Sequence, residues 1–128
     1  MSTNRDVGAK SVKSWKVSEH HGALEWLAER GTSLVMLPLV FWALYSATQI
    51  AGKGFDTALA FVKTPLNAGL IGLLVIMAVW HMYMGLKVII DDYLAGPMRG
   101  FLIFLVFLLS AVLLVASLGA LYFVHQGA

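Results

Sequence analysis

Residues 66–94 read LNAGLIGLLVIMAVWHMYMGLKVIIDDYL, a long apolar run with one histidine, His81, near its middle. From Pro65 to Leu86 the chain contains no Asp, Glu, Lys or Arg. A helix that crosses a bilayer needs about 20 apolar residues, so this run is long enough to span a membrane. If the span ends near Ile90, His81 lies about 13 Å inside it, close to the bilayer midplane.

An ionisable side chain at that depth is costly and needs a partner inside the protein. A neutral imidazole can hydrogen-bond to another helix, relay protons, or bind a metal or haem iron. One turn further on, Gly85 leaves room for either a flat macrocycle or a closely packed helix. Met77 and Met84 lie near the same face, where methionine usually fills a core.

The composition identifies an integral membrane protein. The chain has 128 residues, of which 59% are hydrophobic and 12% charged, whereas soluble domains average about 25% charged residues. It has no cysteine, which excludes disulfides, thiolate metal sites and covalently attached haem. The net charge of +2 comes from scattered basic residues, so a nucleic-acid partner is not expected.

Patterning predicts an all-α membrane protein. Residues 1–18 are polar and without sustained periodicity, so they predict an extended cytoplasmic arm ahead of a membrane domain at 19–128. Residues 19–30 predict a short interfacial helix with Ser18 as its cap. Apolar runs predict three transmembrane helices, at residues 32–51, 66–90 and 100–124.

Several details accompany these spans. Pro38 predicts a mild kink in the first span. The loop at residues 52–64 has the pattern of an amphipathic turn from Leu59 to Val62. In the third span, Ser110 and Ser117 are expected to bond to their own helix, and the following His125 to be solvated.

Basic residues set the expected orientation. Seven lie on the side of the N-terminus and of the turn between the second and third spans, whereas Lys53 and Lys63 lie on the other side. The positive-inside rule therefore places the N-terminus in the cytoplasm and the C-terminus outside. Arg30, Asp92 and Tyr93 are then expected at the cytoplasmic interface.

Two groups of residues carry a family resemblance. The first is the spacing His81-x3-Gly85-x6-Asp92-Tyr93. The second is Trp26-x3-Arg30-x-Thr32-Ser33, followed by an apolar run with Pro38. Together they resemble the D-type membrane anchor subunit of bacterial succinate dehydrogenase, complex II, from about His20 onward. The Arg-His-Leu and Ser-Pro-His segments typical of the C-type anchor are absent.

The resemblance implies a role for four residues. His81 corresponds to an axial ligand of haem b, the other ligand being a histidine of the C-type anchor. Arg30 corresponds to a position near the haem propionates. Tyr93 corresponds to a hydrogen-bond donor to a ubiquinone carbonyl, with Asp92 beside it.

Simpler interpretations remain for each position. Tyr93 also fits an aromatic side chain that anchors the helix at the membrane interface. Asp91 and Asp92 fit a solvated helix end. Arg30 fits another basic residue that determines topology. The histidine pair at residues 20–21 has no assigned role, although a place near the propionates is conceivable.

By resemblance, the chain is expected to anchor succinate:ubiquinone oxidoreductase in the bacterial inner membrane, without binding succinate or being catalytic alone. The expected partners are a homologous three-helix C-type anchor, an iron–sulfur subunit and a flavoprotein subunit, with a trimer of such heterotetramers as a further possibility. The alternatives are a fumarate reductase anchor, or a cofactor-free structural or transport subunit.

Overall fold

A computed structural model describes the backbone of residues 3–127 and the side chains of residues 22–127. It contains four helices: α1 (Thr3–Ile50), α2 (Phe55–Lys63), α3 (Pro65–Tyr93) and α4 (Pro97–Gln126). Three segments are long and apolar enough to cross a membrane: Gly22–Ile50, Pro65–Tyr93 and Pro97–Gln126. The prediction of an all-helical, three-span membrane protein is confirmed.

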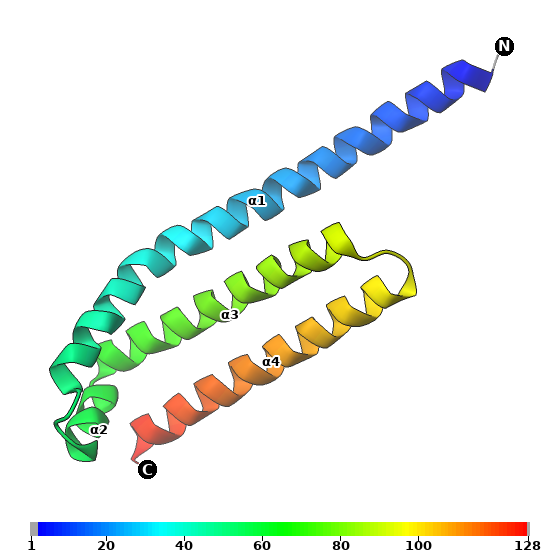
Figure 1. Cartoon of the computed structure of the whole chain (residues 1–128). Helices are drawn as coiled ribbons and strands as arrows, with labels where there is room; N and C mark the ends of the chain where they lie inside the picture. The colour runs from blue at the N-terminus through cyan, green and yellow to red at the C-terminus, as the bar shows by residue number, and fades with distance from the viewer. Residues whose placement is uncertain (1–2, 128) are drawn as a thin grey trace.

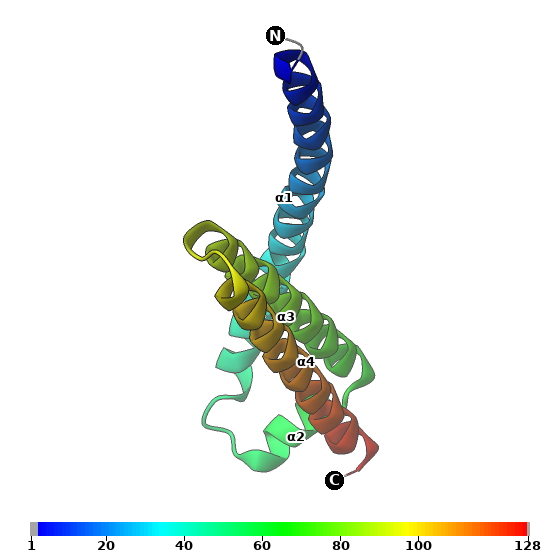
Figure 2. The same ribbon diagram turned by 90° about the vertical axis from the view of Figure 1, so that its right-hand side faces the viewer.

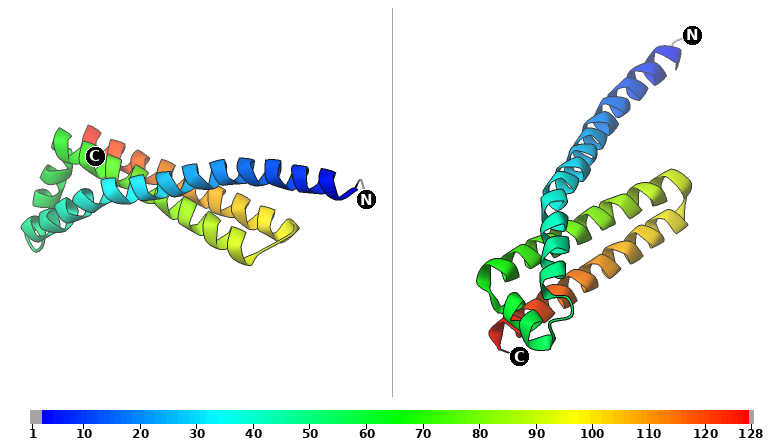
Figure 3. Two further views of the ribbon diagram at one scale, coloured as in Figure 1. Left: turned by 90° about the horizontal axis from the view of Figure 1, so that it is seen from above. Right: turned by 60° about the vertical axis from the view of Figure 1, so that its left-hand side comes forward.

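Helices α3 and α4 form an antiparallel hairpin, and α1 packs against α3 (Figure 1). The N-terminal part of α1 extends beyond the α3–α4 turn, and α2 lies at the opposite end, near the C-terminus (Figures 1 and 2). Seen from above, α1 crosses the hairpin at an angle rather than lying parallel to it (Figure 3, left). Contacts between α1 and α3 include the pairs Glu25–Lys87 and Thr32–His81.

The N-terminal region differs from the prediction. Residues 3–30 continue directly into the first span as one helix, so Ser18 lies inside α1 and begins no separate interfacial helix. Residues 3–18 are helical instead of extended. The stretch contains no proline before Pro38, and a nucleated helix propagates through residues of ordinary propensity until something stops it. The short separate helix of this protein is α2, where an amphipathic turn was expected.

Proline and glycine define the helix boundaries around α3 and α4. Pro65 and Pro97 occupy first-turn positions, where a missing N–H breaks no helical hydrogen bond. Before α4, Gly96 has a φ of 74°, a left-handed conformation that costs glycine least. The C-terminal end of α3 is therefore held close to the start of α4.

Few side chains are buried within this chain. Among residues 22–127 the buried ones are Thr32, Leu39, Ser46, Ile90 and Ser110. Three of them recur at intervals of seven on α1, at Thr32, Leu39 and Ser46, which marks the face that packs on the hairpin. Two of those three carry small hydroxyl side chains, which allow membrane helices to approach closely. Most large apolar side chains remain exposed for lipid or another subunit.

Two polar side chains of α4 differ from the prediction. Ser110 is 6% exposed, and its hydroxyl makes no hydrogen bond to its own helix or to any other described residue. His125 is half-buried rather than solvated, and its Nδ1 is buried without a hydrogen-bond partner in the same part of the chain. Both lie away from the polar groups that gather between α1 and α3.

Candidate functional site

His81 contacts α1 through a single polar atom. Its Nδ1 lies 3.0 Å from the hydroxyl oxygen of Thr32, which is only 4% exposed. The same hydroxyl lies 3.0 Å from the carbonyl oxygen of Ala28 and 2.9 Å from that of Glu29. Within the part of the chain whose side chains are described, the second ring nitrogen, Nε2, makes no hydrogen bond. The imidazole is thus fixed on one side and available on the other.

A hollow of about 570 Å³ adjoins this imidazole. Residues from two helices line it: Trp26, Glu29, Arg30, Ser33, Leu34 and His81. The Arg30 guanidinium lies 4.5 Å from the centre of the Trp26 ring, in a cation–π contact between residues one turn apart. Stacking on the ring fixes a positive charge beside the hollow.

The register of α1 against α3 places Arg30 nearer to His81 than to Tyr93 along α3. Glu25 contacts Lys87 and Thr32 contacts His81, so residue 30 of α1 lies level with about residue 83 of α3. At 1.5 Å per residue, this level is about 15 Å from Tyr93. Arg30 therefore does not share a level with Asp92 and Tyr93; it lies with His81 around the hollow instead.

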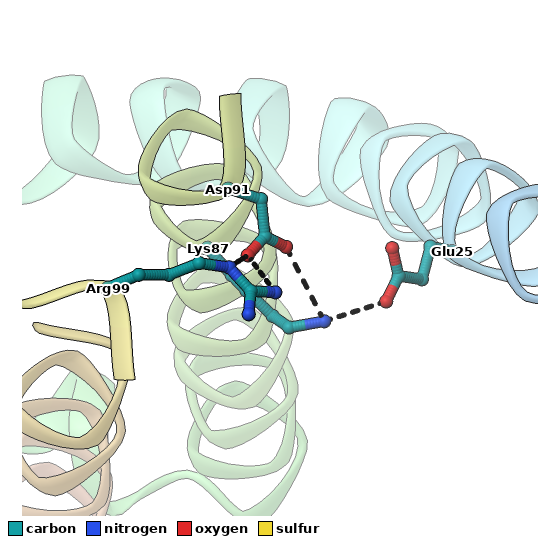
Figure 4. Close-up of polar contacts among 4 residues, drawn as sticks. All are labelled: Glu25, Lys87, Asp91 and Arg99. Atoms are coloured by element: carbon teal, nitrogen blue, oxygen red, sulfur yellow. Dashed lines mark hydrogen bonds and ion pairs between the residues drawn. The ribbon is translucent and has the colours of Figure 1, made fainter. Parts of the chain in front are cut away.

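A cluster of four charged side chains lies nearer the α3–α4 turn (Figure 4). Lys87 Nζ lies 2.8 Å from Glu25 Oε1 and 4.0 Å from Asp91 Oδ2. Arg99 contacts Asp91 Oδ1 through Nη2 at 2.6 Å and Nε at 2.7 Å. The cluster links α1, α3 and the start of α4. Asp91 is therefore an ion-pair partner and not merely a solvated helix end.

The predicted quinone residues lie at the end of α3. Tyr93 is the last residue of that helix and is 82% exposed. Asp92 is also exposed, and the described side chains include no ion pair to it. Both side chains are free to contact another molecule, and the chain itself does not bring them near His81.

The residues around His81 fit one half of a haem site. An imidazole with one hydrogen-bonded nitrogen and one free nitrogen is a suitable axial ligand. The hollow has the volume of a small-molecule site, and Arg30 suits a carboxylate, although the Glu29 carboxylate also lines it. One turn from His81, a Cβ placed on Gly85 would meet no atom within 4 Å. No described side chain of residues 22–127 fills that space.

The other half would have to come from outside the described residues. Across residues 22–127, no three His, Cys, Asp or Glu side chains converge as a metal-binding group. The other histidine of this range, His125, lies in the last turn of α4. The pair at residues 20–21 lies among the residues whose side chains are not described, so its role stays undetermined.

Thr32 is the site residue to which the sequence assigned no role. It belongs to the segment Trp26-x3-Arg30-x-Thr32-Ser33, and a hydroxyl inside an apolar span can form a hydrogen bond to a neighbouring helix. Thr32 and His81 are 49 positions apart in sequence, so their pairing depends on how α1 packs against α3. That packing is not readable from either helix alone.

These features define a class: a multi-pass helical membrane protein with an imidazole in an apolar span, beside a hollow lined by Arg30 and Glu29, and a charged cluster nearer one end. Residues 9–117 match the family described as "Succinate dehydrogenase/Fumarate reductase transmembrane subunit". The chain belongs to this family, as the resemblance implied.

Curated relatives agree with this membership. The chain is 31% identical over 120 residues to the succinate dehydrogenase hydrophobic membrane anchor subunit of Rickettsia bellii, covering 91% of both chains. It is 27% identical over 118 residues to the protein of the same name from Rickettsia typhi, again covering 91% of both. The succinate dehydrogenase membrane anchor subunit of Reclinomonas americana is 26% identical over 78 residues, 59% of this chain and 65% of that one. No solved structure matches the chain.

Proposed function

We propose that this chain is the D-type membrane anchor of a succinate:ubiquinone oxidoreductase and provides one axial ligand to a haem b. The observation that carries the proposal is His81, held by Thr32 at Nδ1 and otherwise unbonded at the edge of the Arg30-lined hollow. A homologous C-type anchor supplies the second histidine. Its helix occupies the open side near Gly85.

In this proposal each group has a physical task. Bound haem supplies a one-electron redox centre inside the membrane. His81 would hold the iron through Nε2, and the Arg30 guanidinium, oriented by Trp26, would neutralise a propionate. The exposed apolar faces of the helices exclude water from the region by packing against lipid and the partner anchor.

The quinone site of the proposal lies at the end of α3. The phenolic O–H of Tyr93 donates a hydrogen bond to a ubiquinone carbonyl and so stabilises the charge that develops as the quinone is reduced. Asp92, the preceding residue, is acidic and exposed, and it serves proton uptake from the aqueous side. The exposure of both residues leaves room for quinone and for a partner subunit that completes the pocket.

The remaining subunits supply what this chain lacks. A peripheral flavoprotein oxidises succinate, and an iron–sulfur subunit passes the electrons to the membrane domain; the chain alone is not catalytic. We place the complex in a bacterial inner membrane with the N-terminus cytoplasmic and the C-terminus periplasmic, where a trimer of heterotetramers can assemble.

Spectroscopy of the purified complex tests the haem assignment. A reduced-minus-oxidised spectrum is expected to show a b-type haem band, and His81→Ala is expected to abolish it or reduce it strongly. His125→Ala is the matched control, because it removes an imidazole from the far end of α4. An unchanged band in the His81→Ala complex rules out ligation by His81.

Two other functions compete with this proposal. A fumarate reductase anchor is possible because the family includes both enzymes, whereas the named relatives all favour succinate dehydrogenase. A cofactor-free structural or transport subunit would use His81 only for its bond to Thr32. A purified complex without b-type haem favours the cofactor-free subunit. The identities of the co-purifying subunits distinguish succinate dehydrogenase from fumarate reductase.

A further inference from the structure

We infer that Thr32 is a positioning residue that fixes the tautomer and orientation of His81. The inference deepens the proposed function and rests on it. It begins with the number of hydrogens available at the contact. The Thr32 hydroxyl has one hydrogen and lies within hydrogen-bonding distance of three groups: the Ala28 and Glu29 carbonyl oxygens and His81 Nδ1.

The two carbonyl oxygens can only accept hydrogen bonds. A helical threonine commonly donates its hydrogen to a carbonyl three or four residues earlier, and both distances, 3.0 and 2.9 Å, are suitable. The hydroxyl oxygen then has a lone pair directed at His81 and accepts a hydrogen bond at 3.0 Å. The hydrogen of that bond is on Nδ1.

This assignment determines the other side of the ring. A neutral imidazole with its hydrogen on Nδ1 carries a free lone pair on Nε2. Because the two nitrogens lie on different sides of the ring, Nε2 is directed away from Thr32. An Nδ1–H bonded to oxygen also makes the imidazole more basic, as it does in metal-binding histidines generally.

The burial of Thr32 makes the arrangement specific. Thr32 is 4% exposed, between α1 and α3, where water has little access to replace its hydroxyl. The Glu25–Lys87 ion pair lies seven residues earlier on α1 and six later on α3, about 10 Å away along the helices. Both contacts belong to one register of α1 against α3, and in that register the Thr32 hydroxyl lies against Nδ1.

The test replaces the hydroxyl with a methyl group of similar size, Thr32→Val, in the full complex. The haem is expected to bind about 10- to 100-fold more weakly, the range seen when a metal ligand loses its outer hydrogen bond. The midpoint potential is expected to rise, because a less basic imidazole stabilises ferric iron less. The g values of the low-spin ferric haem in electron paramagnetic resonance are expected to shift with the orientation of the ring.

Two further variants separate the hydroxyl from general effects. Thr32→Ser keeps the hydroxyl and is expected to retain the wild-type potential and g values. Thr48→Val makes the same chemical change on α1 at an exposed residue, whose hydroxyl donates to the Tyr45 carbonyl and accepts from the Gln49 amide, and it is expected to change nothing. If Thr32→Val does not assemble, Thr32→Ala compared with Thr32→Ser asks the same question with smaller side chains.

The outcomes are distinct for the two proposals. A complex that contains b-type haem, with wild-type potential and g values in the hydroxyl-free variants, overturns the role of Thr32 and leaves ligation by His81 standing. A haem band that survives in His81→Ala overturns the proposed function and this inference with it.

Discussion

At the scale of single residues, Tyr93 combines a phenolic hydroxyl with 82% exposure at the last position of α3. In the proposed quinone site its hydroxyl donates a hydrogen bond that strengthens as charge builds on the quinone carbonyl. Removing one such donor costs about 10²- to 10³-fold in rate at sites of this kind. Tyr93→Phe is therefore expected to lower ubiquinone reduction by at least tenfold.

The measurement compares two acceptors in the same preparation. Succinate oxidation with an artificial acceptor that takes electrons before the membrane domain is expected to be unchanged in Tyr93→Phe. Tyr122→Phe, at an exposed tyrosine near the other end of the hairpin, serves as the matched control. Equal activity of Tyr93→Phe and wild type with both acceptors would remove Tyr93 from the quinone site.

The sequence could indicate single candidate residues, but it could not indicate which side chains of different helices contact each other. His81, Arg30, Asp92 and Tyr93 carry their signals locally, as an ionisable group in an apolar run or as a spacing within one segment. The pairing of Thr32 with His81, and of Asp91 with Arg99, requires knowledge of how helices pack. The level of Arg30, nearer to His81 than to Tyr93, depends on the same helix packing.

At the scale of helices, α1 and α3 are joined by the Glu25–Lys87 ion pair near one end of their contact. The two side chains are 52% and 30% exposed, so solvent screens their attraction. Exposed pairs contribute about 0.2–1 kcal/mol, and a coupling within this range is expected here. A double-mutant cycle of Glu25→Gln and Lys87→Met should return that value.

The cycle is measured by thermal unfolding of the complex in one detergent at low and moderate salt. The coupling should decrease as salt rises, because screening acts on exposed charges. Glu29→Gln provides a comparison on the same helix, since the described residues give this carboxylate no ion pair. A coupling of zero at low salt would mean that packing alone holds the α1–α3 register.

The apolar runs of the sequence predicted all three spans, because length and hydrophobicity suffice to identify a membrane helix. They did not predict that residues 3–30 join the first span without interruption. Hydrophobicity changes sharply in that region, whereas helical hydrogen bonding is indifferent to polarity. The change from polar to apolar residues therefore predicted a break between two helices, although the helix continues through it.

At the scale of the whole molecule, few side chains among residues 22–127 are buried within the chain. Large aromatic and aliphatic side chains are exposed along α1, α3 and α4. Lipid can cover such surfaces, but a half-buried imidazole beside a charged hollow requires protein or a cofactor. The open side of His81 is thus the face on which the partner anchor is expected.

The orientation in the membrane follows from basic residues at the ends of the spans. Arg30 lies inside the segment Gly22–Ile50 and Lys87 inside Pro65–Tyr93, so neither is counted when the basic residues on the two sides are compared. Without them, five basic residues lie on the side of the N-terminus and the α3–α4 turn, against two on the side of α2. The positive-inside rule therefore still predicts a cytoplasmic N-terminus.

The absence of cysteine permits a direct test, because one introduced thiol is the only one in the chain. Two exposed alanines lie in loops on opposite sides, Ala51 between α1 and α2 and Ala95 between α3 and α4. In intact spheroplasts, a membrane-impermeant maleimide is expected to label Ala51→Cys, and to label Ala95→Cys only after the membrane is opened. The reverse pattern would place Tyr93 on the periplasmic side, where a peripheral subunit delivering electrons from the cytoplasm could not reach it.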